Sequence, residues 1–553
     1  MTDSASFALT CLVLLVLLGL AYIPLGNYMA KVYETSHHLR VEKWVYKLVG
    51  VDPDADQRWT VYLRSLLVFS FVSVLFLFAF QRVQHWLPLS LGQSAVSPGV
   101  AFNTAISFVT NTNWQSYSGE STMGILVQMG GLAVQNFMSA AVGMAVAVAL
   151  IRGFVRRETE RVGNFWVDLV RTSLRILLPL AFVAALVLLA NGVTQNLVNP
   201  VHVTTLSHAA QVIPQGPIAS QEAIKELGTN GGGYFNANSS HPYENPNPIT
   251  NLLEIFLILV IPFALTRTFG RMVGRPRYGF AILGAMVAIF VLCLGLTYWA
   301  EMAHGGIALQ AARSSMEGKE VRFGVPSSVL FGVATTSTST GAVNSFFSSF
   351  TPFGGGVVLF DILLGEVSPG GSGSGLYGML MLAILTVFIA GLMVGRTPEF
   401  LGKKIGPREM KLVSLYILSV PALILAGAGV AMALPGPRAS ILNGGPHGLT
   451  EVLYAYASAA NNNGSAFAGL NANTTFYNST LGVVMALGRL IPIIFVIALA
   501  GSLVRQRTTQ ESEGTMPADR PQFTVLLVGV AIIVTGLTYF PALALGPLAE
   551  GLH

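Results

Sequence analysis

Four short runs of Asn, Thr, Ser and Gly recur along the chain, and their oxygen atoms could bind a cation. Aligning the ends of the runs yields the triplets Asn111-Thr112-Asn113, Thr229-Asn230-Gly231, Ser339-Thr340-Gly341 and Asn462-Asn463-Gly464. A single triplet of this kind is ordinary in a turn. Four of them at similar spacing indicate a unit that the chain repeats four times.

A stretch of about ten residues precedes each triplet. The stretches cover residues 102–110, 220–228, 328–336 and 451–460; the second is polar and the others are moderately apolar. Ten helical residues extend about 15 Å, half the thickness of the hydrocarbon core of a bilayer. Such a segment can enter the membrane from one side and return, if its non-helical part is enclosed by protein or lines a watery path. The pattern therefore predicts four re-entrant pore loops.

Four pore loops around one axis would bring rings of backbone carbonyls together. Such rings can replace the hydration shell of a potassium ion. Turning successive carbonyls toward the ion requires backbone angles that glycine adopts freely, and Gly231, Gly341 and Gly464 end three of the triplets. Asn113 ends the first, and Asn tolerates positive φ better than most residues. We therefore predict an asymmetric potassium filter that binds strongly at one site rather than conducting many ions at once.

Two neighbours of the triplets, Gln115 and Gly232, are candidates for shaping the outer mouth of this filter. Polar side chains are common in ordinary loops, so a purely structural role for Gln115 is equally open.

The composition requires a membrane environment for these loops. The 553 residues are 52% hydrophobic and only 10% charged, whereas soluble proteins carry about 25% charge. The mean hydropathy is +0.62. The two cysteines, Cys11 and Cys293, lie in apolar runs, so neither a disulfide framework nor a cysteine–histidine metal site is expected. The sequence has neither an Asp-Lys-Thr-Gly-Thr phosphorylation motif nor a phosphate loop ending in Gly-Lys-Ser or Gly-Lys-Thr, so we do not expect this chain alone to hydrolyse ATP.

Apolar runs long enough to cross the membrane as helices recur about ten times. We place them at 7–29, 61–83, 124–150, 176–194, 250–266, 278–301, 376–395, 412–434, 480–504 and 522–546. Most Lys and Arg residues follow the first, third, fifth, seventh and ninth runs. By the positive-inside rule these loops are cytoplasmic, so both termini and the four polar loops should lie outside. The basic residues are then expected to contact lipid headgroups rather than nucleic acid.

We therefore predict an all-α polytopic membrane protein in which four helix–pore-loop–helix units surround a central filter. The expected segments are an extra N-terminal helix at 1–30, repeats at 61–150, 173–270, 278–396 and 410–505, and an extra C-terminal helix at 522–547. The second helix of the third repeat is expected to be broken by a glycine-rich stretch.

One charge lies deep within a predicted span. Arg489 is in the ninth run, where an uncompensated charge costs at least about 2.5–3.5 kcal/mol, so it needs a partner or a water-filled cavity. Because the third and fourth repeats should be neighbours, Glu366 is the preferred partner and Asp361 the second choice. Such a pair could serve transport or only hold the repeats together.

The glycine-rich stretch that follows Glu366 is a candidate gate. It contains Gly370, Gly371, Gly373 and Gly375. Glycine removes side-chain restraint, so a broken helix at this point could move to open or close the pore. A static re-entrant turn is the alternative.

At these residues the sequence resembles the potassium-binding subunits of the bacterial potassium-transporting P-type ATPases, the KdpA family of the potassium-transporter superfamily. The matching motifs lie at 110–115, 228–242, 336–341, 395–399 and 461–470, and the likeness extends over essentially the whole chain. The resemblance implies that potassium is the transported ligand, bound at the filter without a covalent cofactor.

The resemblance also implies partners and a location. These are an ATP-hydrolysing P-type subunit (KdpB), a single-span subunit (KdpC) and often a small peptide (KdpF), in the bacterial inner membrane. It further implies that Glu366 and Arg489 lie beneath the filter, near the ion route.

Other kinds of membrane protein fit the sequence less well. An independent four-repeat potassium channel or symporter is the main alternative. A carrier for an organic solute would be expected to have inverted repeats, whereas these loops repeat in one direction. A membrane scaffold would have no reason to enclose four polar loops.

Overall fold

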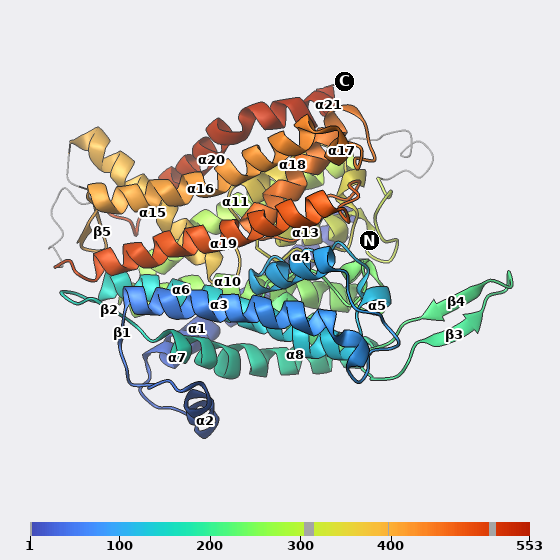
Figure 1. The fold of residues 1–553 in the computed structure, drawn as a ribbon. Coiled ribbons are helices and arrows are strands. Elements are labelled where there is room, and N and C mark those ends of the chain that lie inside the picture. Colours follow the sequence, from blue (N-terminus) through green and yellow to red (C-terminus); the bar gives the residue numbers. More distant parts are fainter. Residues whose placement is uncertain (1–2, 304–314, 396–397, 508–515, 553) are drawn as a thin grey trace.

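The computed structural model describes residues 3–303, 315–395, 398–507 and 516–552. Within these ranges, ten helices are long and apolar enough to cross a membrane, and they run side by side in one bundle (Figure 1). The chain is thus a multi-pass, mainly helical membrane protein, as the sequence predicts.

The long helices correspond to the ten expected runs. They are α1 (Asp3–Glu34), α3 (Trp59–Arg82), α6 (Val134–Val155), α8 (Leu178–Ala190), α10 (Pro248–Met272), α11 (Pro276–Ala303), α15 (Ser374–Val394), α16 (Pro407–Ala433), α19 (Thr475–Leu503) and α20 (Pro521–Leu543). The π-helical turn η2 (Val127–Ala133) extends α6, while α7 (Phe165–Arg171) and the π-helical turn η3 (Thr172–Leu177) extend α8.

The fourth span begins earlier than expected, at Phe165 instead of residue 176. The side chain of Asn164 accepts hydrogen bonds from the backbone N–H groups of Trp166 and Val167, which caps the helix at this point. Arg175 remains within the span because it forms an ion pair with Glu42. Basic residues that the sequence suggested were in a loop are therefore helical.

Four shorter helices lie between pairs of spans. They are α4 (Pro98–Val109), α9 (Ile218–Leu227), α13 (Gly324–Thr336) and α18 (Gly445–Asn461). Proline stands in the first turn of α4 and of α18, where no backbone N–H is required. We call these four the pore helices, because each ends where one of the polar triplets begins.

The seventh span is broken, as the glycine-rich stretch predicts. The short apolar helix α14 (Pro352–Leu363) is followed by ten non-helical or turn residues at 364–373 before α15 begins. Positive φ angles at Gly365, Glu366, Gly370 and Gly373 turn the chain between the two helices.

The remaining elements are small. In the described part of the chain, three two-stranded antiparallel sheets pair β1 (Gln57–Arg58) with β2 (Arg161–Gly163), β3 (Val201–Thr204) with β4 (Ala210–Ile213), and β5 (Glu399–Phe400) with β6 (Lys403–Lys404). The short α-helices are α2 (Arg40–Val49), α5 (Gly119–Thr122), α17 (Pro435–Arg438) and α21 (Ala549–Leu552). The other short turns are η1 (Gln84–Trp86), η4 (Asn238–Ser240), η5 (Phe347–Ser349) and η6 (Ala544–Leu548).

The two ends of the bundle differ. The N- and C-termini, α17 and the β3–β4 hairpin lie toward one end, and β1, β2 and β5 lie at the other (Figure 1). The extra N-terminal helix α1 packs along α10. The repeat boundaries remain a prediction, although each pore helix does lie between two spans in the chain.

Candidate functional site

The four polar loops meet in a closed ring. Gly231 of the second loop lies so close to the third that an added Cβ would be 2.8 Å from Thr340 O. Gly341 approaches Asn463 O of the fourth loop, and Gly464 approaches Thr112 O of the first, both more closely than a Cβ would allow. The ring closes at Gly232, where an added Cβ would be 3.0 Å from Asn113 O.

The loops have similar but not identical backbone conformations. At the last place of the triplets, φ is 58° at Asn113, 83° at Gly341 and 95° at Gly464. The expectation of a left-handed backbone is wrong for Gly231, because the positive φ of that loop falls on Gly232, at 71°. Glycine is needed at residue 231 to let the third loop approach.

The first places of the triplets show the same partial symmetry. The angle φ is 67° at Asn111, 50° at Thr229 and 62° at Asn462, whereas Ser339 has no positive φ. Three of the four loops thus start in a left-handed conformation, and the ring is asymmetric in its backbone as well as in its side chains.

Amide side chains connect the loops and are fully buried. Asn111 Nδ2 donates to Thr229 O at 2.7 Å, and Asn230 Nδ2 donates to the side-chain oxygens of Asn111 and Asn113 at 2.8 and 2.9 Å. Asn462 Nδ2 donates to Thr112 Oγ1 at 2.9 Å. These amides act as struts, each holding one loop against another.

Backbone carbonyls at the second and third places of every triplet have no such partner. Within the described residues, no hydrogen bond is donated to the carbonyl oxygens of Thr112, Asn113, Asn230, Gly231, Thr340, Gly341, Asn463 and Gly464. All of these residues except Gly464 are buried. A buried carbonyl without a donor is rare in a folded protein. Each loop thus contributes two such carbonyl oxygens, one at the second and one at the third place of its triplet, and a cation could bind them.

The pore helices add to this preference for a cation. The triplets begin within three residues of the last residue of α4, α9, α13 or α18. The C-terminal end of a helix carries about half a negative charge. Four such ends directed at one ring make the local potential negative.

Residues that follow the first and fourth triplets line a cavity of about 780 Å³; Trp114, Gln115, Ala466 and Asn471 are among them. Gln115 also joins the first two loops, because its Nε2 donates to Gly233 O and its Oε1 accepts from Gly233 N, both at 3.1 Å. Gln115 and Gly232 therefore both lie at the contact between the first two loops.

The expectation that Arg489 forms an ion pair with Glu366 is wrong. No ion pair within 4.0 Å joins Arg489 to Glu366 or Asp361 in the described part of the chain. Glu366 instead accepts a hydrogen bond from Ser339 Oγ of the third triplet. Asp361 accepts from Ser337 Oγ at 2.6 Å, also in the third loop.

Arg489 faces a different element. Its guanidinium lies against Gly143 of α6, where an added Cβ would be 3.0 Å from Nη2. The same added Cβ would also meet the carbonyl oxygen of Ser372. Arg489 is therefore next to the glycine-rich stretch, with both carboxylates already engaged by hydroxyls of their own repeat.

The glycine-rich stretch packs directly against the ring. Gly370 N donates to Ser337 O at 2.9 Å, and Ser372 N donates to Thr229 Oγ1 at 2.8 Å. Gly373 has a φ of 91° and touches the backbone of Gly143. Neither Gly371 nor Gly375 could carry a Cβ without a clash, so the whole stretch is closely packed.

Known proteins resemble this chain over almost its whole length. The family model of the potassium-transporting ATPase A subunit, KdpA, matches residues 12–552. The chain belongs to the KdpA family.

Curated relatives in this family span the full length of the chain. The potassium-transporting ATPase potassium-binding subunit of Streptomyces griseus is 60% identical over 552 residues, which is 100% of both chains. The protein of the same name from Mycobacterium avium is 60% identical over 544 residues, 98% of each chain. Among solved structures, the potassium transporter TrkH from Vibrio parahaemolyticus matches with a TM-score of 0.54 and 15% identity. That match covers 88% of this chain and 97% of the other, and it shows a shared fold alone.

One feature of this KdpA-family chain is missing from the sequence predictions. Behind the second loop, Glu222, Lys225 and Glu226 of α9 form a buried charged cluster with Glu244 and Glu254. The spacing of the first three was a usable signal, since residues three and four apart share one helix face. A charged face on a helix expected to be enclosed by protein predicts internal ion pairs.

Proposed function

We propose that this chain binds and selects potassium ions at the ring of four loops and passes them inward, as the ion-binding subunit of an ATP-driven uptake complex. The eight loop carbonyls without hydrogen-bond donors among the described residues, seven of them in buried residues, carry this proposal. Curated relatives of the same length are named potassium-binding subunits of a potassium-transporting ATPase, which supports potassium as the ion.

The proposed filter consists of the twelve residues of the four triplets. Carbonyl oxygens supply the coordination that the ion loses with its water, and the amide struts keep the loops from collapsing or spreading. The first loop has Asn113 in place of glycine, and the second has its left-handed residue one position later. We expect this asymmetry to make one site the strongest.

Beneath the filter, we propose that the glycine-rich stretch gates the ion route. Its backbone N–H groups donate hydrogen bonds to both the second and the third loop. A movement of this stretch would therefore shift the ring. Arg489, close to the same stretch, would repel a cation that leaks past a closed gate. Glu366, bonded to Ser339, would offer the ion a negative charge as it leaves the filter.

The gate can be tested at Gly371, because a methyl group there would press on Ser339 and Ser374. We expect Gly371→Ala to slow turnover while the potassium concentration for half-maximal stimulation changes little. Unchanged turnover would favour a static turn. Gly373→Pro is a poor test, since proline cannot adopt the φ of 91° at this residue.

We further propose the partners that the family resemblance implies, KdpB for ATP hydrolysis, KdpC and the small peptide KdpF. The proposed location is the bacterial inner membrane, with both termini and the filter mouth outside. Support comes from the basic residues, which cluster in the loops expected to be cytoplasmic. The termini and the β3–β4 hairpin also lie toward one end of the bundle (Figure 1).

The experiment is to tag the chain, isolate it with whatever co-purifies, and measure ATP hydrolysis with and without micromolar potassium. A co-purifying subunit and potassium-stimulated hydrolysis would support the proposal. A preparation without ATP hydrolysis that lets potassium flow down its gradient would contradict it and favour a channel or symporter.

A further inference from the structure

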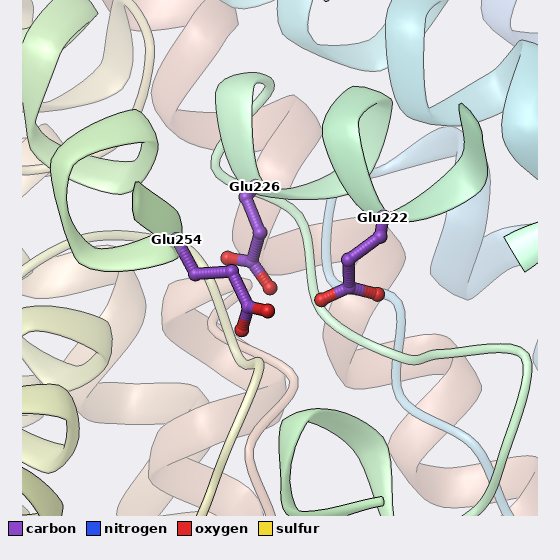
Figure 2. Close-up of side chains that lie close together, drawn as sticks. All are labelled: Glu222, Glu226 and Glu254. Carbon is purple, nitrogen blue, oxygen red and sulfur yellow. The ribbon is translucent and has the colours of Figure 1, made fainter. Parts of the chain in front are cut away.

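Five charged side chains lie buried behind the second filter loop. Glu222, Lys225 and Glu226 belong to α9, Glu254 belongs to α10, and Glu244 lies in the segment between these helices. None is more than 1% exposed. The carboxylates of Glu222, Glu226 and Glu254 point toward one another across the two helices (Figure 2).

Lys225 neutralises only part of this charge. Its Nζ lies 2.8 Å from Glu222, 3.3 Å from Glu226 and 3.4 Å from Glu244. The second oxygen of Glu244 accepts from Phe235 N at 2.8 Å. Lys225 thus contacts three carboxylates, and Glu254 adds a fourth to the cluster, so one ammonium group faces four buried carboxyl groups that would carry an excess of negative charge if all were ionised.

The oxygens that Lys225 does not reach are concentrated on one side of the cluster. Both carboxylate oxygens of Glu254, and Oε2 of Glu226, are buried and have no hydrogen-bond partner among the described residues. A buried carboxylate without a partner costs several kcal/mol, and proteins compensate it with a cation or a proton. Glu254 is independent of the α9 charges in sequence, yet it is directed at them.

We propose that Glu222, Glu226 and Glu254 bind a divalent cation of the calcium or magnesium class, a site separate from the potassium filter. One oxygen from each lies within 4.8 Å of the other two. Calcium and magnesium bind oxygen ligands at about 2.0–2.6 Å, so ligand oxygens on opposite sides of the ion are about 4–5 Å apart. The three carboxylates therefore already have the spacing that such an ion requires.

The ion would have a structural consequence for the filter. It would bind α9 to the first turns of α10, and α9 leads directly into Thr229-Asn230-Gly231. The ion would therefore fix the position of the second loop in the ring, while the potassium sites themselves use other atoms.

A proton is the competing way to reduce the charge. Burial raises the pKa of the Glu244 carboxyl to about 8, although Lys225 opposes the shift. Protonated carboxyls would need no metal ion, and the experiment must separate the two cases.

The test compares the metal content of the tagged, full-length chain, isolated with its co-purifying subunits, for the wild type and Glu254→Gln. Glu451→Gln is the matched control, because Glu451 is also buried, lies on a pore helix and has one oxygen without a partner among the described residues, but is outside the cluster. After incubation with calcium and magnesium and extensive desalting, we expect the wild type and the control to retain about one more divalent ion per chain than Glu254→Gln. A chelator should lower the Tm of the wild type and of the control but not that of Glu254→Gln.

Equal metal content in the wild type and Glu254→Gln would overturn the proposal. If the wild type lacks the ion and its Tm falls as the pH rises through about 8, protons neutralise the cluster instead. Either result leaves the potassium filter untouched, because the metal content is measured independently of potassium stimulation.

Discussion

The second and fourth polar loops occupy equivalent places in the ring but are held by different interactions. The fourth relies on glycine conformation and neutral hydrogen bonds: Gly464 has a φ of 95°, and Asn463 Nδ2 donates to Thr335 O and Thr338 O at 2.8 Å. The second has no positive φ at Gly231 and is backed by the buried charges around Lys225. One architecture is thus reached by two physical routes.

The difference has consequences for how each loop tolerates change. Neutral hydrogen bonds contribute about 0.5–1.5 kcal/mol each, so the loss of one is tolerable. A buried charge cluster responds sharply, because removing one member leaves its partners uncompensated. The second loop should therefore be sensitive to changes well away from the ring, whereas the fourth should be sensitive mainly within the ring itself.

The largest effect is expected from Gly464→Ala in the fourth loop. Alanine at positive φ costs about 1–2 kcal/mol, and its methyl group would overlap Thr112 O. We expect potassium-stimulated ATP hydrolysis to be lost. Gly274→Ala is the control, since Gly274 has a φ of 72° and nothing within 4 Å of an added Cβ. Equal activity of the two variants would show that the fourth loop does not need the close approach.

A large effect on stability is expected from Lys225→Met behind the second loop. The substitution keeps the length of the side chain but leaves the neighbouring carboxylates without their ammonium group, at a cost of about 3–5 kcal/mol. Thermal unfolding should show a strongly lowered Tm. Adding Glu222→Gln should recover part of the loss, because one unpaired charge is then gone. If Lys225→Met is as stable as the wild type, the buried charges do not stabilise the second loop.

The smallest effect is expected from Tyr454→Phe in α18, the pore helix of the fourth loop. It removes the hydrogen bond between the Tyr454 hydroxyl and Ser465 Oγ, which is 2.7 Å long and buried. We expect a loss of about 0.5–1.5 kcal/mol in the free energy of unfolding and nearly normal potassium stimulation. A collapse comparable to that of Lys225→Met would remove the contrast between the two loops.

Much of this architecture is predictable from the sequence. Apolar runs, basic loops and the four triplets are local signals, and they yield the ten spans, the pore helices and the break before α15. The family follows from the same motifs. The role of each triplet residue in the ring is harder to predict. Glycine is needed at residue 231 because the third loop, which is distant in the chain, packs against it.

The same limit explains the wrong pairing of Arg489 with Glu366. Repeat order places two units next to each other, but it does not show which face of a helix meets which neighbour. Ser339 donates a hydrogen bond to Glu366 within the third repeat, and Arg489 lies against Gly143 of the first repeat. The buried cluster could likewise be predicted only by knowing that Glu244 and Glu254 pack beside the charged residues of α9.

The most direct test of the central claim is the potassium dependence of ATP hydrolysis for the wild type and Gly231→Asp, measured on the isolated complex. Gly231 lies where the second and third loops touch, and a side chain there would displace Thr340 O. If the ring selects potassium, the variant will need a much higher potassium concentration for the same stimulation. An unchanged potassium dependence would contradict the claim that the ion is selected at these four loops.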